Sequence, residues 1–401
     1  MKKRILFLMS DTGGGHRAAA LAIEEAIHHL YPETYQTYVE DVWKHHTPWP
    51  VNKIPNTYAW LTGPGLPLWR LMWSGLAYWS AHHFVIPGIS PVLERKMLRY
   101  LDALRPDVMV SVHPLMNHLG LKWLRKLQWD IPFVTVVTDM VTIHPLWICP
   151  KVTCCLVPTE LAREKALRFG MNPDKVEVVG QPVGLKFGGM SPNKEAARRL
   201  LGLDLGRRTV LVMGGGEGFG PVFEIARKIA GTVPLAQLLV VAGRNQALKD
   251  RLEAATWEIP TRIYGFTNQM PELMRAADVV ITKAGPGTIS EAFIAGVPPL
   301  ISGYIPGQEK GNVTYVQEHH AGAYAETPAE IAHLISDWFM PNNPTLDEMT
   351  GNAARLARPE ASLKIAAKVC SLIGNQTNLE VRSGKRRVAY LAGKIFSFSS
   401  K

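Results

Sequence analysis

Short apolar runs alternate along most of the chain with stretches in which apolar residues recur every three or four positions. The runs lie at residues 5–9, 107–114, 132–139 and 154–159 in the first half, and at 208–213, 236–243, 261–266, 278–285 and 298–304 in the second. Short apolar runs separated by helical spacing are typical of buried parallel strands with helices on both faces. We therefore predict an α/β sheet in each half.

Two stretches, residues 4–27 and 208–230, have the same order of strand, glycine loop and helix. The two halves meet near residues 180–195, where glycines, prolines and polar residues predict a linker. A chain of 401 residues also exceeds what one core usually serves. We predict a GT-B architecture, with two Rossmann-like domains facing an interdomain cleft. Other enzymes built from two Rossmann halves share this plan, so it does not decide the function.

The expected domains follow from these patterns. The N-terminal Rossmann-like domain covers residues 1–187, and the C-terminal one covers residues 188–350. Residues 351–375 are expected to form a helix that crosses back to the N-terminal domain, and residues 376–401 to form a basic and aromatic tail. Lys2, Lys3 and Arg4 before an apolar run resemble the start of a signal peptide, but Asp11 and the glycines interrupt the run, which favours a first β-strand.

The segment from residue 43 to residue 93, here called the Trp-rich segment, has another composition. It holds six of the 11 tryptophans, namely Trp43, Trp49, Trp60, Trp69, Trp73 and Trp79. No residue from 71 to 93 carries a formal charge, but serines, histidines, glycine and prolines interrupt that stretch. We predict amphipathic pieces that lie in a membrane interface rather than a spanning helix. The alternative is a helical excursion buried against its own domain.

The charge of the chain is compatible with a polyanionic partner. Lys and Arg number 44 against 34 Asp and Glu, which gives a net charge of +10. This excess suits an anionic membrane or nucleic acid, or it is ordinary solvated surface. Basic and apolar residues also alternate in residues 381–401, which indicates membrane contact or a solubilising disordered tail. The four cysteines, Cys149, Cys154, Cys155 and Cys370, form no zinc motif, so we expect a reduced cytosolic setting.

Two glycine loops are candidates for phosphate binding. Residues 214–218 (GGGEG) and 284–288 (AGPGT) each follow a predicted strand and precede a helix, where bare amides and the helix N-terminus attract phosphate. Neither loop has the Gly-Lys-Ser/Thr of a Walker motif, and no acidic residue follows the first loop at the position that binds the NAD ribose. The chain also has no Asp-x-Asp, so nothing in it requires manganese or magnesium.

Polar residues beyond the second loop are placed to bind a sugar nucleotide. Glu291 would lie one turn into the helix, within reach of a ribose if phosphates sit at the helix N-terminus. The cluster at residues 308–312 follows a strand and a turn, where it could bind sugar hydroxyls. The alternative is a capped loop at the edge of the sheet.

Several blocks together resemble the monogalactosyldiacylglycerol synthase family, which belongs to glycosyltransferase family 28 with the peptidoglycan lipid-intermediate N-acetylglucosaminyltransferase. The blocks are SDTGGGHRA, VTDMVTIHPLW, GGGEGFGP, GFTNQMPELM, ITKAGPGTISEA and GYIPGQEKGN, which occur in the family's order between about residues 5 and 325. The Trp-rich segment and the tail resemble nothing in detail.

The resemblance implies a role for each matching residue. The UDP-sugar site would comprise Gly214, Gly215, Gly216, Glu217, Gly285, Pro286, Gly287 and Thr288 around the diphosphate, Phe266 and Met270 beside the uracil, Glu291 at the ribose, and Gln308, Glu309 and Asn312 at the hexose. The acceptor side would comprise Gly13, Gly14, Gly15, Asp139, His144 and Trp147.

The implied reaction is the inverting transfer of galactose from UDP-galactose to the sn-3 hydroxyl of 1,2-diacylglycerol. A base must take the hydroxyl proton, and imidazole suits this near neutral pH. His16 would be that base, although Asp139 could take the role with His16 as its partner, and a histidine that only caps a helix is the third alternative. Backbone donors and helix N-termini would stabilise the departing UDP without a metal cofactor.

The resemblance implies diacylglycerol as the acceptor, while the positive charge leads us to expect anionic membrane lipids as partners and no nucleic acid. With the cysteines, we expect a cytoplasmic protein that is peripheral on the inner face of the membrane. Three other functions remain open. A diacylglycerol glucosyltransferase, processive or not, would differ only in the donor. A UDP-sugar 2-epimerase would need no lipid. A lipid-binding module without catalysis would lose only stability on removal of His16.

Overall fold

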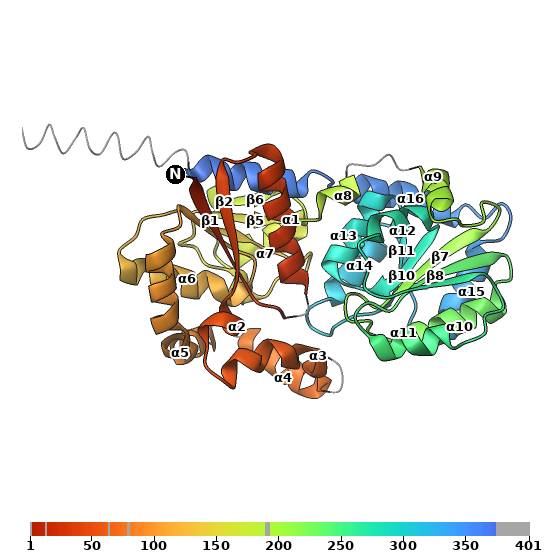
Figure 1. Cartoon of the computed structure of the whole chain (residues 1–401), viewed down its shortest axis with the longest axis horizontal. Helices are drawn as coiled ribbons and strands as arrows, with labels where there is room; N and C mark the ends of the chain where they lie inside the picture. Colours follow the sequence, from red (N-terminus) through yellow and green to blue (C-terminus); the bar gives the residue numbers. More distant parts are fainter. Residues whose placement is uncertain (1, 13, 63–64, 78–80, 189–192, 374–401) are drawn as a thin grey trace, which may run out of the picture.

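Two parallel six-stranded sheets form the framework of the protein. The computed structural model describes residues 2–12, 14–62, 65–77, 81–188 and 193–373. The first sheet has the strand order β2-β1-β3-β4-β5-β6, and the second has the order β12-β11-β10-β7-β8-β9. Each sheet lies in its own half of the molecule, and the two halves stand side by side (Figure 1).

The predicted strands all form in these sheets. They are β1 (Lys3–Met9), β3 (Val108–Ser111), β4 (Phe133–Val136), β5 (Cys154–Val157), β7 (Arg208–Met213), β8 (Ala236–Val241), β9 (Thr261–Tyr264), β10 (Val279–Lys283) and β11 (Pro299–Gly303). Three further strands were not predicted, namely β2 (Tyr35–Asp41), β6 (Val176–Val178) and β12 (Ala323–Tyr324). β2 and β12 are edge strands with partly exposed residues, and β6 has only three, so none of them produces an apolar run.

Helices cover both faces of the first sheet because its central strands are buried on both sides. Leu6 and Leu8 of β1 pack with residues of α5 (Ala81–Leu104) and α6 (Pro114–Leu127). Ile5, Phe7 and Met9 point to the other face, where they pack with α1 (Gly15–Leu30) and with a helix at residues 361–373. α7 (Glu160–Arg168) follows in this half, and the short α8 (Leu185–Gly188) lies where the halves meet, since Leu185 packs on the first core and Phe187 on the second.

The second sheet is covered in the same way. Val210 and Val212 of β7 pack with α10 (Val222–Thr232) and α15 (Pro328–Trp338), while Leu211 and Met213 pack with α12 (Met270–Ala276) and α13 (Pro286–Ala295). The remaining helices here are α9 (Lys194–Leu200), α11 (Gln246–Glu253), α14 (Lys310–Glu318) and α16 (Thr345–Leu356). The same alternation of side chains thus builds a separate core in each half.

The chain returns to the first sheet after α16. The helix at residues 361–373 lies over that sheet beside α1, drawn in blue in Figure 1. Ser362 donates a hydrogen bond to the Val183 carbonyl (2.7 Å) and accepts one from the Val183 amide (3.0 Å). α16 spans the expected boundary at residue 350, so we propose that the crossing begins after Leu356. The expected tail at residues 376–401 lies outside the described residues.

The Trp-rich segment forms short helices between β2 and β3. These are α2 (Val42–His46), the 3-10 helix η1 (Val51–Thr57), α3 (Tyr58–Leu61), α4 (Leu66–Ala77) and the first part of α5. In the part of the chain that is described, every helix is too short or too polar to cross a membrane. Trp43 is buried, whereas Trp49 and Trp60 are 78% and 55% exposed. Trp69 and Trp73 are partly buried, and Trp79 lies outside the described residues.

Gly120 in α6 offers a test of the packing between α6 and the first sheet. A Cβ atom on Gly120 would overlap the Phe133 ring and lie 3.2 Å from a methyl carbon of Leu8. We expect Gly120→Ala to lower the free energy of unfolding by about 1–3 kcal/mol, because the core around it is already filled. Urea unfolding followed by circular dichroism measures the change.

The matched control is Gly351→Ala in α16, where a Cβ atom would meet nothing within 4 Å. This variant should gain about 0.5–1 kcal/mol from the higher helix propensity of alanine. Equal effects of the two substitutions would contradict the packing described for Gly120.

Candidate active site

His16 lies at the N-terminus of α1, immediately after the glycine loop. Gly14 has φ +75°, which suits glycine, and a Cβ atom on either Gly14 or Gly15 would point into open space. The His16 Nδ1 atom is 3.2 Å from the Thr138 hydroxyl oxygen, and its ring packs edge-on against His113, 4.7 Å between centroids. Burial lowers the pKa of His16 to about 4, so the imidazole is neutral at pH 7. Gly13 lies outside the described residues.

Asp139 and Trp147 form the acceptor side together with His16. The Trp147 indole N–H donates to Asp139 Oδ2 (2.7 Å), and its ring centroid lies 6.2 Å from that of His16. Burial raises the pKa of Asp139 to about 6, although the hydrogen bonds from Trp147 and Gln308 oppose this shift. Asp139 is therefore mostly ionised at pH 7, and both of its oxygens accept hydrogen bonds.

The bond from Gln308 crosses between the two halves of the molecule. Gln308 follows β11 in the second half, and its Nε2 atom donates to Asp139 Oδ1 (3.3 Å), which follows β4 in the first half. The neighbouring Glu309 is buried and accepts hydrogen bonds from the Lys283 ammonium and from the Ile305 amide (2.9 Å). The expected hexose-binding residues thus lie beside the expected acceptor-side residues.

The two glycine loops lie at the carboxyl ends of neighbouring strands, β7 and β10. The first loop turns sharply, because the Phe219 amide donates to the Gly214 carbonyl (2.9 Å) and Gly215 has φ +72°. A Cβ atom on Gly214 would overlap the backbone of Phe219. The second loop starts α13 with Pro286 as its first residue, followed by Gly287 and Thr288, so the positive end of the helix dipole faces this edge of the sheet.

Lys283 lies between the two loops. A Cβ atom on Gly285 would lie 3.2 Å from its Nζ atom, and one on Gly215 would lie 3.8 Å from its Cε atom. Asn312 is buried on the same side and donates to the Ala284 carbonyl (2.9 Å), while its Oδ1 atom has no hydrogen-bond partner among the residues described. The arrangement places a cation, bare amides and an unpaired carbonyl oxygen around one position.

The expected uracil and ribose residues border the same edge. Phe266 is 60% exposed, and the Arg244 guanidinium stacks on its ring, 4.1 Å from the centroid. Arg244 also pairs with Glu217 of the first loop (2.9 Å). Met270 is the first residue of α12, and its side chain is less exposed than that of Phe266. Burial raises the pKa of Glu291, in α13, to about 7.

His144, which was expected on the acceptor side, contacts the Trp-rich segment. Its Nδ1 atom accepts from the Leu146 amide (3.1 Å) and caps the 3-10 helix η2 (Pro145–Trp147). Its ring packs edge-on against Trp73, 4.7 Å between centroids. Burial lowers the pKa of His144 to about 4. This histidine therefore joins the acceptor side to the Trp-rich segment.

Several residues of the site were not found from the sequence. His113 and Thr138 contact His16, Lys283 lies between the glycine loops, and Tyr58 contacts Gln308. His113 and Lys283 directly follow or end predicted strands, and this position at the carboxyl edge of a parallel sheet was an available signal. Tyr58 gave no signal, because 250 residues separate it from its partner.

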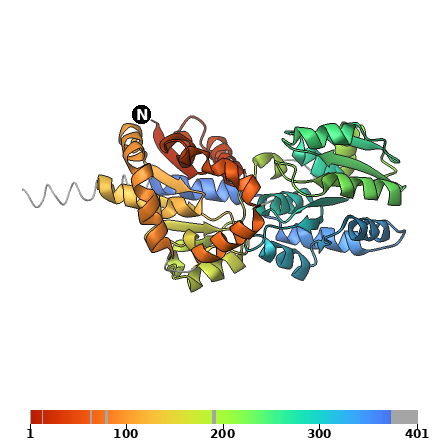
Figure 2. The same cartoon turned by 90° about the horizontal axis from the view of Figure 1, so that it is seen from below.

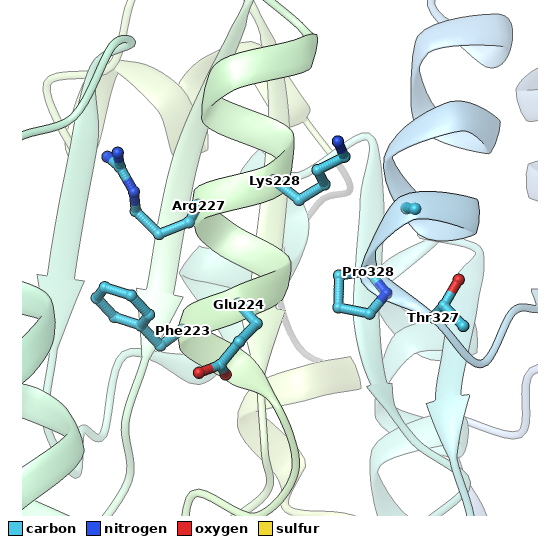
Figure 3. A pocket seen from close by; sticks show the side chains of 7 residues that line it. Phe223, Glu224, Arg227, Lys228, Thr327 and Pro328 are labelled. Atoms are coloured by element: carbon cyan, nitrogen blue, oxygen red, sulfur yellow. The ribbon is translucent and has the colours of Figure 1, made fainter.

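Two further features lie outside this group of residues. Among the residues described, no cluster of three or more His, Cys, Asp or Glu side chains could hold a metal ion, and the expected metal independence stays a prediction. A surface pocket of about 540 Å³ lies between α10 and the start of α15, lined by Phe223, Arg227 and Pro328 among others (Figure 3). None of the predicted site residues lines it.

Family models match most of the chain. One described as monogalactosyldiacylglycerol (MGDG) synthase matches residues 16–183. One described as the glycosyltransferase family 28 C-terminal domain matches residues 209–355. Each match covers one half of the structure. The first match begins at His16, and the second contains both glycine loops of the second half.

Curated relatives are similar over nearly the whole chain. The chloroplastic monogalactosyldiacylglycerol synthase of Spinacia oleracea is 42% identical over 380 residues, which are 92% of this chain and 73% of the relative. The chloroplastic monogalactosyldiacylglycerol synthase 1 of Arabidopsis thaliana is 40% identical over 386 residues, 94% of this chain and 72% of the relative.

Solved structures share the fold. MurG of Acinetobacter baumannii has a TM-score of 0.61 at 17% identity, and the match covers 92% of this chain and 99% of that chain. Anabaena HepE in complex with UDP-glucose has a TM-score of 0.55 at 15% identity, with 92% and 99% covered. These neighbours and the two parallel sheets confirm the predicted α/β fold of GT-B architecture.

The expected cytoplasmic location on the inner face of the membrane is wrong. The relatives with about 40% identity are named as chloroplastic proteins. The expectation was based on unpaired cysteines, and all four are indeed free and buried. Free thiols indicate a reducing compartment but do not tell one such compartment from another.

The motifs noted in the sequence, the fold and the relatives agree. The six sequence blocks that resembled one family lie at the carboxyl edges of the sheets or in the loops that follow them. The relatives cover the Trp-rich segment as well, since the matches include more than nine-tenths of the chain. The chain belongs to the monogalactosyldiacylglycerol synthase family of glycosyltransferases.

Proposed function

We propose that this protein transfers galactose from UDP-galactose to the sn-3 hydroxyl of 1,2-diacylglycerol and gives β-monogalactosyldiacylglycerol. The main support is the hydrogen bond between Gln308 and Asp139, because it places a proposed hexose-binding residue in contact with a residue of the acceptor side. The choice of galactose rests on the names of the relatives at about 40% identity. A glucose donor would differ only in the orientation of one hydroxyl.

The second half would bind the donor. The amides of Gly214–Gly216 and the N-terminus of α13 face the same edge of the sheet. The ammonium of Lys283, which pairs with Glu309, lies between them with N–H donors left for a phosphate. Phe266 and Met270 would border the uracil, Glu291 would hold the ribose, and Gln308, Glu309 and Asn312 would contact the hexose. A solved neighbour in complex with UDP-glucose is compatible with this kind of donor.

His16 would act as the base. Its neutral imidazole would take the proton of the glycerol hydroxyl while that oxygen attacks the anomeric carbon, and the bond from this carbon to the diphosphate would break so that UDP leaves with the electron pair. Its low pKa makes the free imidazole a weak base, and the negative charge of a bound diphosphate would raise that pKa. The open space at Gly14 and Gly15 leaves room for the acceptor.

Asp139 would position groups rather than accept the proton. Both of its oxygens already accept hydrogen bonds, from Trp147 and from Gln308. As an ionised carboxylate it orients the Gln308 amide, which faces the hexose in this proposal. Of the two bases that the sequence left open, this proposal takes His16 and gives Asp139 the positioning role.

The Trp-rich segment would dock the protein on the membrane that contains the lipid acceptor. Among the side chains of this segment that the structure describes, Trp49, Trp60, Leu68 and Leu71 are large, apolar and exposed. Such side chains partition well into a membrane interface, and the net charge of +10 would favour anionic lipids. These observations support anionic membrane lipids as partners, as the sequence suggested.

Incubation with diacylglycerol vesicles and labelled UDP-galactose or UDP-glucose, followed by product identification, tests the function. We expect β-monogalactosyldiacylglycerol from UDP-galactose, faster on vesicles that contain anionic lipid and unchanged by a chelator. His16→Ala should lower kcat by about 10²–10⁴-fold, because general base catalysis contributes about that much, and should leave UDP binding intact.

The control for this variant is His29→Ala, an exposed histidine on the same helix. A His16→Ala protein that transfers galactose normally, or that loses UDP binding in proportion to activity, would contradict the role of His16. If the main product is a glucolipid, the protein is a diacylglycerol glucosyltransferase instead.

The pH profile tests the role of Asp139. Its pKa is raised to about 6, so the protonated form predominates below that pH and removes an acceptor of the Gln308 hydrogen bond. The pKa of His16, about 4, lies lower, so the first acid limb belongs to Asp139. We expect kcat/KM to fall below about pH 6, and this limb to disappear in Asp139→Asn. If the fall in kcat/KM below about pH 6 persists in Asp139→Asn, another group causes it.

Lys283→Met tests the proposed diphosphate site, since it removes the charge and keeps most of the volume. A hydrogen bond to a charged group contributes about 1.5–3 kcal/mol, so the Kd for UDP should rise by about 10–100-fold. The control is Lys228→Met in α10, which changes the net charge equally, and calorimetry measures both. The same Kd in both variants would show that Lys283 does not contact the diphosphate.

A further inference from the structure

A row of aromatic rings in edge-on and tilted contact connects the Trp-rich segment to the acceptor side. The row, here called the aromatic ladder, consists of Tyr58, Trp69, Trp73 and His144. Successive ring centroids lie 5.5, 5.4 and 4.7 Å apart. Rings at these distances stabilise one another. The ladder is therefore an ordered surface on α3, α4 and η2, and it differs from the exposed Trp49 and Trp60.

The aromatic ladder contacts three consecutive residues of the loop after β11. The Trp69 indole N–H donates to the Pro306 carbonyl (3.3 Å), the Trp73 ring lies against Gly307, and the Tyr58 hydroxyl donates to Gln308 Oε1 (3.2 Å). Figures 1 and 2 show α3 and α4 reaching from the first half toward the second. The loop that carries the proposed hexose-binding residues is thus held from the other half of the molecule.

Trp73 leaves no space on its side of the loop. Gly307 has φ +85°, a conformation that favours glycine, and a Cβ atom on it would lie 2.5 Å from Cδ1 and 2.8 Å from Nε1 of Trp73. The backbone before Gln308 therefore cannot shift toward α4 unless the indole moves. The position of the loop is therefore fixed by the contact with Trp73 as well as by the strand β11 that precedes it.

Tyr58 acts on the side-chain amide of Gln308. The ionised Asp139 only accepts hydrogen bonds, so it takes one N–H of the Gln308 amide, and the oxygen of that amide then faces Tyr58. Burial and the nearby carboxylates of Glu309 and Asp139 raise the pKa of Tyr58, so its hydroxyl keeps the proton that it donates. One N–H and one lone pair of the amide remain for a ligand, in fixed directions.

We propose that Tyr58 is a positioning residue for the donor hexose, and that the Trp-rich segment completes the hexose site by fixing the amide of Gln308. This inference rests on the proposed function, in which Gln308 contacts the hexose. Galactose and glucose differ in the direction of one hydroxyl, so an amide with fixed donor and acceptor directions can tell them apart. A rotating amide can satisfy either hydroxyl.

Binding of UDP-galactose, UDP-glucose and UDP to Tyr58→Phe tests the proposal, because this variant lacks only the hydroxyl. We expect about tenfold weaker binding of the UDP-hexose that the wild type prefers, from the loss of one hydrogen bond, and a smaller preference between the two hexoses. The Kd for UDP alone and the fraction bound to vesicles should not change. Tyr31→Phe, on α1's C-terminal cap, is the matched control.

A double-mutant cycle distinguishes positioning from a general structural effect. In the Gln308→Ala background, Tyr58→Phe should cause no further loss of UDP-hexose affinity, because the group that it orients is absent. A full additional loss there, an equal loss of UDP affinity, or unchanged hexose affinity in the single variant would each overturn the inference. Thermal unfolding of each variant shows that the fold is retained.

The same measurements separate this inference from the function on which it rests. Wild-type protein that binds neither UDP-hexose would contradict the proposed function itself. Wild-type protein that binds and transfers the hexose, together with a Tyr58→Phe variant that behaves identically, would contradict only the positioning role.

Discussion

The hydrogen bond from Gln308 to Asp139 is the contact on which the proposed site depends, because it joins the halves where donor and acceptor would meet. Asp139 follows β4 and Gln308 follows β11, so each lies beyond the carboxyl end of a parallel strand, where such sheets usually bind ligands. Burial keeps the pKa of Asp139 at about 6 in spite of two donors. The carboxylate therefore remains ionised near neutral pH at some cost in desolvation, which its hydrogen bonds partly offset.

The tryptophans of the Trp-rich segment lie in three different environments. Trp43 is buried in the core of the first half, Trp49 and Trp60 face solvent, and Trp69 and Trp73 contact the donor loop of the second half. Composition suggested a membrane surface for all of them. The exposed residues keep that proposed role, whereas Trp69 and Trp73 lie between the halves. Contact with a membrane and the shape of the hexose site would thus involve the same helices.

Much of the site could be predicted from the sequence because its residues lie beside strong local patterns. The glycine loops at residues 214–216 and 285–287 end apolar strands and begin helices, and His16 follows such a loop directly. Lys283 and His113 occupy similar positions but were missed, because neither type stands out without knowledge of its neighbours. The Glu309 carboxylate, predicted to contact sugar, also pairs with Lys283, which only the fold brings near it.

The sequence by itself determined the buried strands and the loops that carry candidate chemistry, because hydrophobic period and glycine conformation act over a few residues. It also determined the family, through blocks that keep their order along the chain. Only the tertiary structure decided which tryptophans face solvent, which residue orients Gln308, and how His16, Trp147 and Asp139 are arranged. These contacts join residues as far apart as Tyr58 and Gln308, and their partners are chosen by packing between helices and loops rather than by any local pattern.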